Sequence, residues 1–166
     1  MAFEGTILDA LKSFPSWLTT FIIAMLPVIE LRGSIPVAVT LFHMDPTDAF
    51  FISIIGNMIP VPFILKLLEP AEKLIRRTGL FENIFDKVST TAKRRTKKSI
   101  EKYEFLGLAL FVSIPLPITG AWTASLAAYL LRMDPKKAFL TIFIGVIIAG
   151  VIVTLASIGI ISFWGI

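Results

Sequence analysis

The heptapeptide MDPTDAF at residues 44–50 returns 89 residues later as MDPKKAF at residues 133–139. Between positions 36 and 59, ten of the 24 residues are identical to their counterparts in the second copy. Apolar composition alone would produce scattered matches and not a shared Met-Asp-Pro-x-x-Ala-Phe string. The sequence therefore predicts two copies of one structural unit, an arrangement typical of membrane transporters.

Long apolar segments flank both copies of the heptapeptide. Hydrophobic residues make up 55% of the 166 positions and charged residues 17%, against roughly 25% charged residues in soluble domains. A membrane-spanning helix needs about 20 apolar residues, and four segments provide them: residues 13–44, 49–68, 105–131 and 138–166. We expect an all-α, multi-pass integral protein of the plasma membrane.

The predicted organisation is a single membrane domain over residues 1–166. The first repeat covers about residues 13–69 and the second about residues 105–166, and each is a re-entrant helical hairpin followed by a transmembrane helix. Residues 1–12 predict a short amphipathic helix. A secretory signal peptide is disfavoured there, because two acidic residues precede the apolar run and no small-x-small cleavage site precedes Pro27.

A basic linker, residues 70–104, joins the repeats and carries ten Lys and Arg against five Asp and Glu. This excess predicts a cytoplasmic location. Its apolar residues Phe81, Ile84, Phe85 and Val88 fall at helical spacing beside the basic cluster KRRTKK. That pattern indicates an amphipathic helix on anionic lipid headgroups and disfavours a nucleic-acid partner.

Basic residues also orient the two Met-Asp-Pro turns. The first turn has no Lys or Arg and is expected outside, whereas Arg132, Lys136 and Lys137 place the second inside. Both locations hold if residues 105–131 enter from the cytoplasm, break near residues 115–120 and return. The repeat then makes residues 13–44 an equivalent hairpin from the outside, so the topology is inverted. The alternative, fully spanning broken helices, leaves three basic residues outside.

Two charges interrupt the first apolar segment within the stretch ELRGSIP, residues 30–36. A charge in the middle of a membrane costs about 2.5 to 3.5 kcal/mol on insertion scales. Glu30 and Arg32 therefore need a partner or a water-filled cavity. In one interpretation they neutralise each other, or Arg32 binds backbone carbonyls at the hairpin tip.

The other interpretation of this stretch is a substrate or ion site. Gly33 and Pro36 favour a break in the helix, and a half-helix starting there would direct free amides inward, next to Ser34. Those amides and Arg32 would hold an anionic group. Glu30 would carry a proton or neutralise a cation.

The stretch PLPITGAWT, residues 115–123, predicts the tip of the second hairpin. Pro115 and Pro117 end the descending helix because each lacks an amide donor, and Gly120 permits a tight reversal. The hydroxyl groups of Thr119 and Thr123 are expected to bind backbone groups that the turn leaves unpaired.

Small residues follow this turn at helical spacing. Gly120, Ala124 and Ala128 form one ridge, and Ala121 and Ser125 form another. We expect these ridges to pack closely against other helices, with substrate contact as the alternative. Trp122 is predicted to be either an interfacial anchor or, from its depth, the wall of a pocket.

A polar residue also lies in the second apolar segment, within GNMIPVP at residues 56–62. Asn57 is interpreted either as part of helix packing near the prolines or as lining the same cavity as Glu30 and Arg32. His43 is expected at the membrane interface and not as a ligand.

Three motifs in order, ELRGSIP, GNMIPVP and PLPITGAWT, resemble the signature segments of the small multidrug export proteins. That family is similar, more distantly, to the DedA-like membrane proteins. The resemblance covers about residues 20–165 and implies a transporter-like fold. It implies functional roles for the matching positions Glu30, Arg32, Gly33, Pro36, Gly56, Asn57, Pro115, Pro117, Thr119, Gly120 and Trp122. DedA-like proteins are implicated in lipid flipping or scrambling, but their extended acidic and arginine motifs are not evident here, so a lipid substrate does not follow from the resemblance alone.

Two functions are compatible with these residues. One is an ion-coupled exporter of small molecules with Glu30 as the coupling site, and the other is a flippase or scramblase for lipids or lipid phosphates. An intramembrane enzyme is disfavoured because the chain has no cysteine and neither a G-x-S-x-G nor an H-E-x-x-H motif. No cofactor or metal is expected. The expected partners are membrane lipids, the substrate and, because one chain encloses little volume, a second copy in a homodimer.

Overall fold

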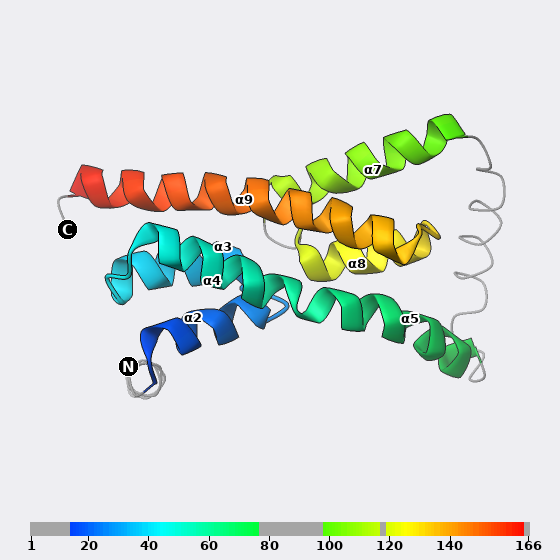
Figure 1. The fold of residues 1–166 in the computed structure, drawn as a ribbon, viewed down its shortest axis with the longest axis horizontal. Coiled ribbons are helices and arrows are strands. Elements are labelled where there is room, and N and C mark those ends of the chain that lie inside the picture. The colour runs from blue at the N-terminus through cyan, green and yellow to red at the C-terminus, as the bar shows by residue number, and fades with distance from the viewer. Residues whose placement is uncertain (1–13, 77–97, 117–118, 165–166) are drawn as a thin grey trace. The chain divides into compact units, whose positions relative to one another are not determined.

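The computed structural model describes residues 14–76, 98–116 and 119–164, and these residues form helices without any strand. The all-α prediction is confirmed for this part of the chain. The predicted helix at residues 1–12 and the apolar and basic residues of the linker between positions 77 and 97 lie outside it. The elements, labelled in Figure 1, are α2 (Ser16–Met25), α3 (Glu30–Pro36), the π-helix η1 (Val37–Leu41), α4 (Pro46–Met58), α5 (Pro60–Arg76), α7 (Lys98–Ser113), α8 (Ala121–Leu130) and α9 (Pro135–Trp164).

Two helical segments are long and apolar enough to cross a membrane. They are Pro46–Pro70 and Pro135–Gly159, each with 25 residues. At about 1.5 Å per residue, such a segment exceeds the roughly 30 Å of the hydrocarbon layer. The first is interrupted at Ile59, between α4 and α5, because Pro60 and Pro62 cannot donate backbone hydrogen bonds. The other two predicted apolar segments contain the shorter helices Ser16–Met25 and Tyr103–Ser113.

The helices belong to two compact units. The first comprises the described residues of 1–58 and 147–166, and therefore holds α2, α3, η1, α4 and the second part of α9. In this unit α3 continues into η1, the chain turns, and α4 runs back antiparallel to α3 (Figure 1). Its buried apolar side chains include Ile23, Leu31, Ile35, Ile54 and Val153.

The reversal between α2 and α3 corrects the predicted break at Gly33 and Pro36. The chain turns at residues 26–29 instead, and both predicted break residues lie inside α3. Pro27 lacks an amide hydrogen, and the N–H of Glu30 closes the turn by donating to the carbonyl of Leu26 at 3.1 Å. Glu30 has a φ of 51°, in the left-handed region that reverses the chain direction.

Pro36 changes the helix type without ending the helix. Its missing N–H removes the bond to the carbonyl of Arg32, one turn earlier. The chain continues as η1, in which the N–H of Phe42 donates to the carbonyl of Val37, five residues back, at 3.2 Å. A π-turn inside a helix is often found near functional sites.

The second unit comprises the described residues of 59–146 and holds α5, α7, α8 and the first turns of α9. Helix α7 ends at Ser113 and α8 begins at Ala121. The predicted break near residues 115–120 is therefore confirmed, although Pro117 itself lies outside the described residues. Helix α8 packs against α5 and α7. The two predicted small-residue ridges are buried as expected for close packing: Gly120, Ala121, Ala124, Ser125 and Ala128.

The two Met-Asp-Pro turns have the same local conformation. The residue before Met has a positive φ in both, 51° at His43 and 56° at Arg132. The Asp side chain then accepts the N–H two residues later, at 2.8 Å in the first turn and 3.0 Å in the second. A helix starts directly at the following proline, Pro46 or Pro135, where a missing N–H costs nothing. The inverted orientation of the two halves in a membrane stays a prediction.

Candidate functional site

A layer of polar side chains lies between α3 and α4 in the first unit. The hydroxyl groups of Ser34 and Ser53 form a hydrogen bond of 2.7 Å, and both residues are fully buried. Helices α3 and α4 are antiparallel. The residue one turn before Ser34 on α3 and the residue one turn after Ser53 on α4 therefore lie at similar heights along the interface. From this spacing we infer that Glu30, the first residue of α3, and Asn57 lie at similar heights along the interface.

Asn57 is the most unusual residue of this polar layer. Its exposed fraction is 0%, and neither Nδ2 nor Oδ1 has a hydrogen-bond partner within the described residues. A buried polar group without a partner costs about 1 to 3 kcal/mol of stability. The amide thus keeps a donor and an acceptor available inside the unit at a cost to folding, which favours the site interpretation over simple packing.

Glu30 is a buried acidic residue at the start of α3. Only 4% of the residue is exposed. Arg32, two residues on, is half-buried and attracts Glu30 electrostatically. This attraction agrees with the interpretation in which the two charges neutralise each other. It does not involve Asn57, whose buried amide needs a separate explanation.

Helix α2 closes the layer from another side. A Cβ added to Gly56, next to Asn57, would lie 2.6 Å from the carbonyl oxygen of Phe21 and 2.9 Å from the Cβ of Ala24. The two backbones can therefore approach only because residue 56 is glycine. Thr20 of α2 is fully buried, and its hydroxyl group donates to the carbonyl of Ser16 at 2.8 Å. Gly33 likewise lies against the side chain of Ile29.

The predicted site residues Thr119 and Thr123 of the stretch PLPITGAWT lie in the second unit, where they stabilise the turn before α8. The hydroxyl group of Thr119 donates to the carbonyls of Ile114 and Leu116, both at 2.9 Å. The hydroxyl oxygen of Thr123 accepts the N–H of Gly120 at 2.9 Å. The predicted use of both threonines for backbone groups is confirmed.

Trp122 and Pro115 belong to the same stretch, PLPITGAWT. Trp122 and Pro115 are half-buried, and Pro115 lies in the non-helical connection between α7 and α8. The first unit thus contains the buried polar residues Glu30, Ser34 and Asn57, and the second unit contains the turn that Thr119 and Thr123 stabilise.

Two features of the structure had not been singled out from the sequence. The first is Ser53, whose spacing of four residues from Asn57 on one helix would have indicated it. The second is a bridge between α5 and α8, in which the Tyr129 hydroxyl group donates to Oε2 of Glu72 and Nη2 of Arg132 donates to Oε1 at 3.3 Å. No sequence pattern links these three residues, because helix packing alone brings them together.

This bridge borders a cavity of about 410 Å³ within the second unit. The guanidinium group of Arg132 also lies over the Tyr129 ring, 5.4 Å from its centroid. The lining residues are Leu65, Glu69, Glu72, Tyr129, Arg132, Met133 and Pro135.

Comparison with known proteins gives one family. The described residues contain no cluster of His, Cys, Asp and Glu able to hold a metal ion, and no curated protein or solved structure matches the chain. The model of the family described as "putative small multi-drug export protein" matches residues 30–152, which is well over half of the sequence. The match begins at Glu30 and includes both Met-Asp-Pro turns. The chain belongs to the small multidrug export protein family.

Proposed function

We propose that the protein exports small organic molecules across the cell membrane and that Glu30 couples this export to an ion gradient, with the proton as the ion. Membership of an export family supports transport and not catalysis. The two apolar segments of 25 residues support a membrane location. Ionisable groups inside membrane segments are expensive and mark substrate or ion pathways.

The observation that carries this proposal is the buried amide of Asn57, which has no hydrogen-bond partner among the described residues. We place this amide within reach of Glu30. A carboxyl group that gains and loses a proton needs neighbours that tolerate both states. An amide does so, because its Nδ2 donates to a carboxylate and its Oδ1 accepts from a carboxylic acid. Arg32 balances the negative charge when the proton leaves. The Ser34 and Ser53 hydroxyl groups extend the polar layer by one turn.

In this mechanism the ion and the substrate use the layer in turn. Protonation of Glu30 weakens its attraction to Arg32, and the released guanidinium then favours a different packing of α3 on α4. Inverted hairpins that open alternately to the two sides would give each state access to one face of the membrane.

Transport in proteoliposomes tests the proposal. Purified protein is reconstituted, a pH gradient is imposed, and movement of a fluorescent organic cation is followed with and without a protonophore. We expect gradient-driven transport by the wild type and its loss in Glu30→Gln, which keeps the shape of the side chain but cannot exchange a proton. Glu30→Asp should retain part of the rate. Asn57→Leu should slow transport at least tenfold while keeping or raising stability, because a buried orphan amide is removed.

The matched control is Glu69→Gln, which removes a carboxylate from an exposed position on α5. It should transport at the wild-type rate. Gradient-driven transport by a folded Glu30→Gln variant would contradict the coupling role. Absence of dye movement combined with protein-dependent exchange of fluorescent lipids between leaflets would instead favour the flippase function.

A further inference from the structure

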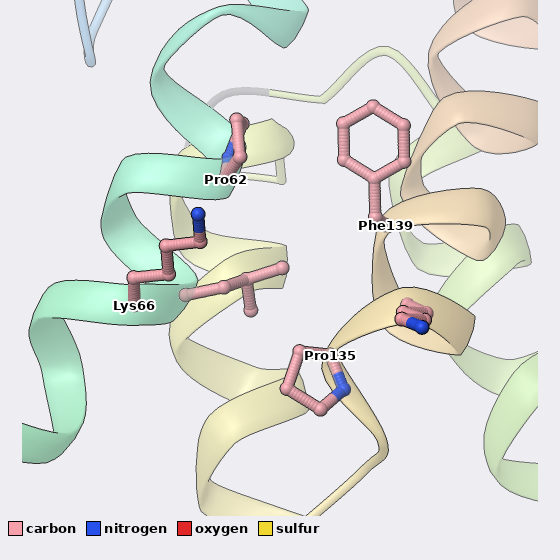
Figure 2. Close-up of a pocket in the computed structure, with 6 residues that line it drawn as sticks. Pro62, Lys66, Pro135 and Phe139 are labelled. Carbon is pink, nitrogen blue, oxygen red and sulfur yellow. The ribbon is translucent and has the colours of Figure 1, made fainter.

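A groove with two lysines lies between α5 and the first turns of α9, within the second unit. Its volume is about 390 Å³. Figure 2 shows Lys66 and Pro62 on the α5 side, facing Pro135 and Phe139 of the α9 segment. The full lining is Pro62, Leu65, Lys66, Pro135, Lys136 and Phe139.

The charged residues that line this groove are both basic. The lining contains two lysines and no acidic residue, and its surface is almost entirely apolar, so the lysines line it mainly with the aliphatic parts of their side chains. Among the described residues, neither Lys66 nor Lys136 forms an ion pair or a side-chain hydrogen bond. Asp134 is adjacent in sequence, but its Oδ1 accepts the backbone N–H groups of Lys136 and Lys137 at 3.0 and 3.1 Å. In the neighbouring cavity, by contrast, Glu72 binds the guanidinium group of Arg132.

The rest of the groove is apolar. Two prolines, Leu65 and Phe139 line it, and Phe139 remains 37% exposed. A small water-soluble anion would use the ammonium groups and leave this surface uncovered. A neutral lipid would cover the apolar surface and leave the charges without a partner. An anionic amphiphile satisfies both parts of the groove.

The position of the lysines along the helices specifies the amphiphile. Lys66 lies one turn before the end of the apolar segment Pro46–Pro70, and Lys136 is the second residue of the segment Pro135–Gly159. Both ammonium groups therefore lie at the end of apolar helices, where lysine side chains reach lipid headgroups. We propose that the groove binds the anionic phosphodiester headgroup of a membrane phospholipid, with Lys66 and Lys136 on the phosphate and an acyl chain along Leu65 and Phe139.

Site-specific photocrosslinking tests this proposal and does not depend on transport. The full chain, with p-benzoylphenylalanine replacing Phe139, is reconstituted into vesicles of equal parts phosphatidylglycerol and phosphatidylcholine. After irradiation, lipid adducts are identified by mass spectrometry. We expect phosphatidylglycerol to dominate the adducts at position 139. The preference should fall about fivefold for each lysine replaced, in Lys66→Gln and Lys136→Gln, which is the attraction expected for one basic residue near anionic lipid.

Two controls separate the groove from the general attraction of a basic protein for anionic lipid. Lys137→Gln removes the same charge from the same helical turn, but the ammonium group of Lys137 lies over the Phe105 ring, 5.8 Å from its centroid, and does not line the groove. Its preference should be unchanged. The crosslinker at Leu140, an exposed neighbour outside the groove, should capture the two lipids almost equally.

Three results would overturn the proposal. One is equal capture of both lipids at position 139, and another is a preference that survives loss of both lysines. The third is the formation of adducts at position 140 and none at position 139. Circular dichroism of each variant establishes that the helices are intact. Since transport is not measured, a negative result here leaves the role of Glu30 unaffected.

Discussion

The close contact between α2 and α4 at Gly56 gives a prediction whose size follows from the structure. In Gly56→Ala the new Cβ would lie 2.6 Å from the carbonyl oxygen of Phe21 and 2.9 Å from the Cβ of Ala24. Both distances are far below a normal contact of about 3.5 Å or more. The first neighbour is a backbone atom and cannot rotate away, so α2 must shift.

The expected magnitude combines two opposing effects. Overpacking of a buried interface costs typically 1 to 3 kcal/mol, here towards the upper value because backbone must move. Alanine gains about 1 kcal/mol over glycine in helix propensity. The net expectation is a loss of about 1 to 2 kcal/mol in the free energy of unfolding.

Unfolding in mixed micelles of dodecyl maltoside and SDS, followed by far-UV circular dichroism, measures this loss. Gly107→Ala is the matched control, because Gly107 is also helical and a Cβ there meets nothing within 4 Å. The control should keep or raise stability through helix propensity alone. Equal or greater stability of Gly56→Ala relative to the wild type would refute the close approach of α2 and α4.

Three further predictions concern the turns and the bridge. The chain has no cysteine of its own, so a single cysteine can report the side on which it lies. A cysteine replacing Thr47 should react with an impermeant thiol reagent from outside, and one replacing Lys136 should react from inside. Reaction of both from the same side would contradict the inverted topology. Tyr129→Phe should lower the free energy of unfolding by about 1 to 2 kcal/mol, since it removes a donor to the Glu72 carboxylate, and unchanged stability in the same micelle assay would exclude that contribution. The backbone N–H of Thr47 binds the Asp45 carboxylate and lowers the pKa of Asp45 below its ordinary value of 3.8. The hydrogen bond should therefore stabilise the folded protein fully above about pH 4, and this contribution should disappear as the pH falls through the pKa of Asp45 in the folded protein. A circular dichroism titration should show this loss for the wild type and not for Asp45→Ala.

The sequence alone predicted those features that depend on neighbouring residues. Apolar runs of this length predicted helices. The second reversal was also predicted, because its prolines remove donors and Thr119 and Thr123 supply hydrogen bonds within five residues in the chain. The first reversal was misplaced. Gly33 and Pro36 have the residue types of a break, yet Pro27 and the positive φ of Glu30 turn the chain a few residues earlier.

Only the tertiary structure decided which polar residues face one another. Glu30 and Asn57 were both noticed as polar residues in apolar segments, but only the antiparallel packing of α3 on α4, which the Ser34–Ser53 hydrogen bond marks, relates one to the other. The groove of Lys66 and Lys136 is decided in the same way, because its two sides come from helices distant in sequence. Local propensity acts over a few residues, whereas register between helices depends on how side chains interlock across the whole interface. The sequence therefore determined the class of protein and most of its helices, and packing decided where the charges and polar groups meet.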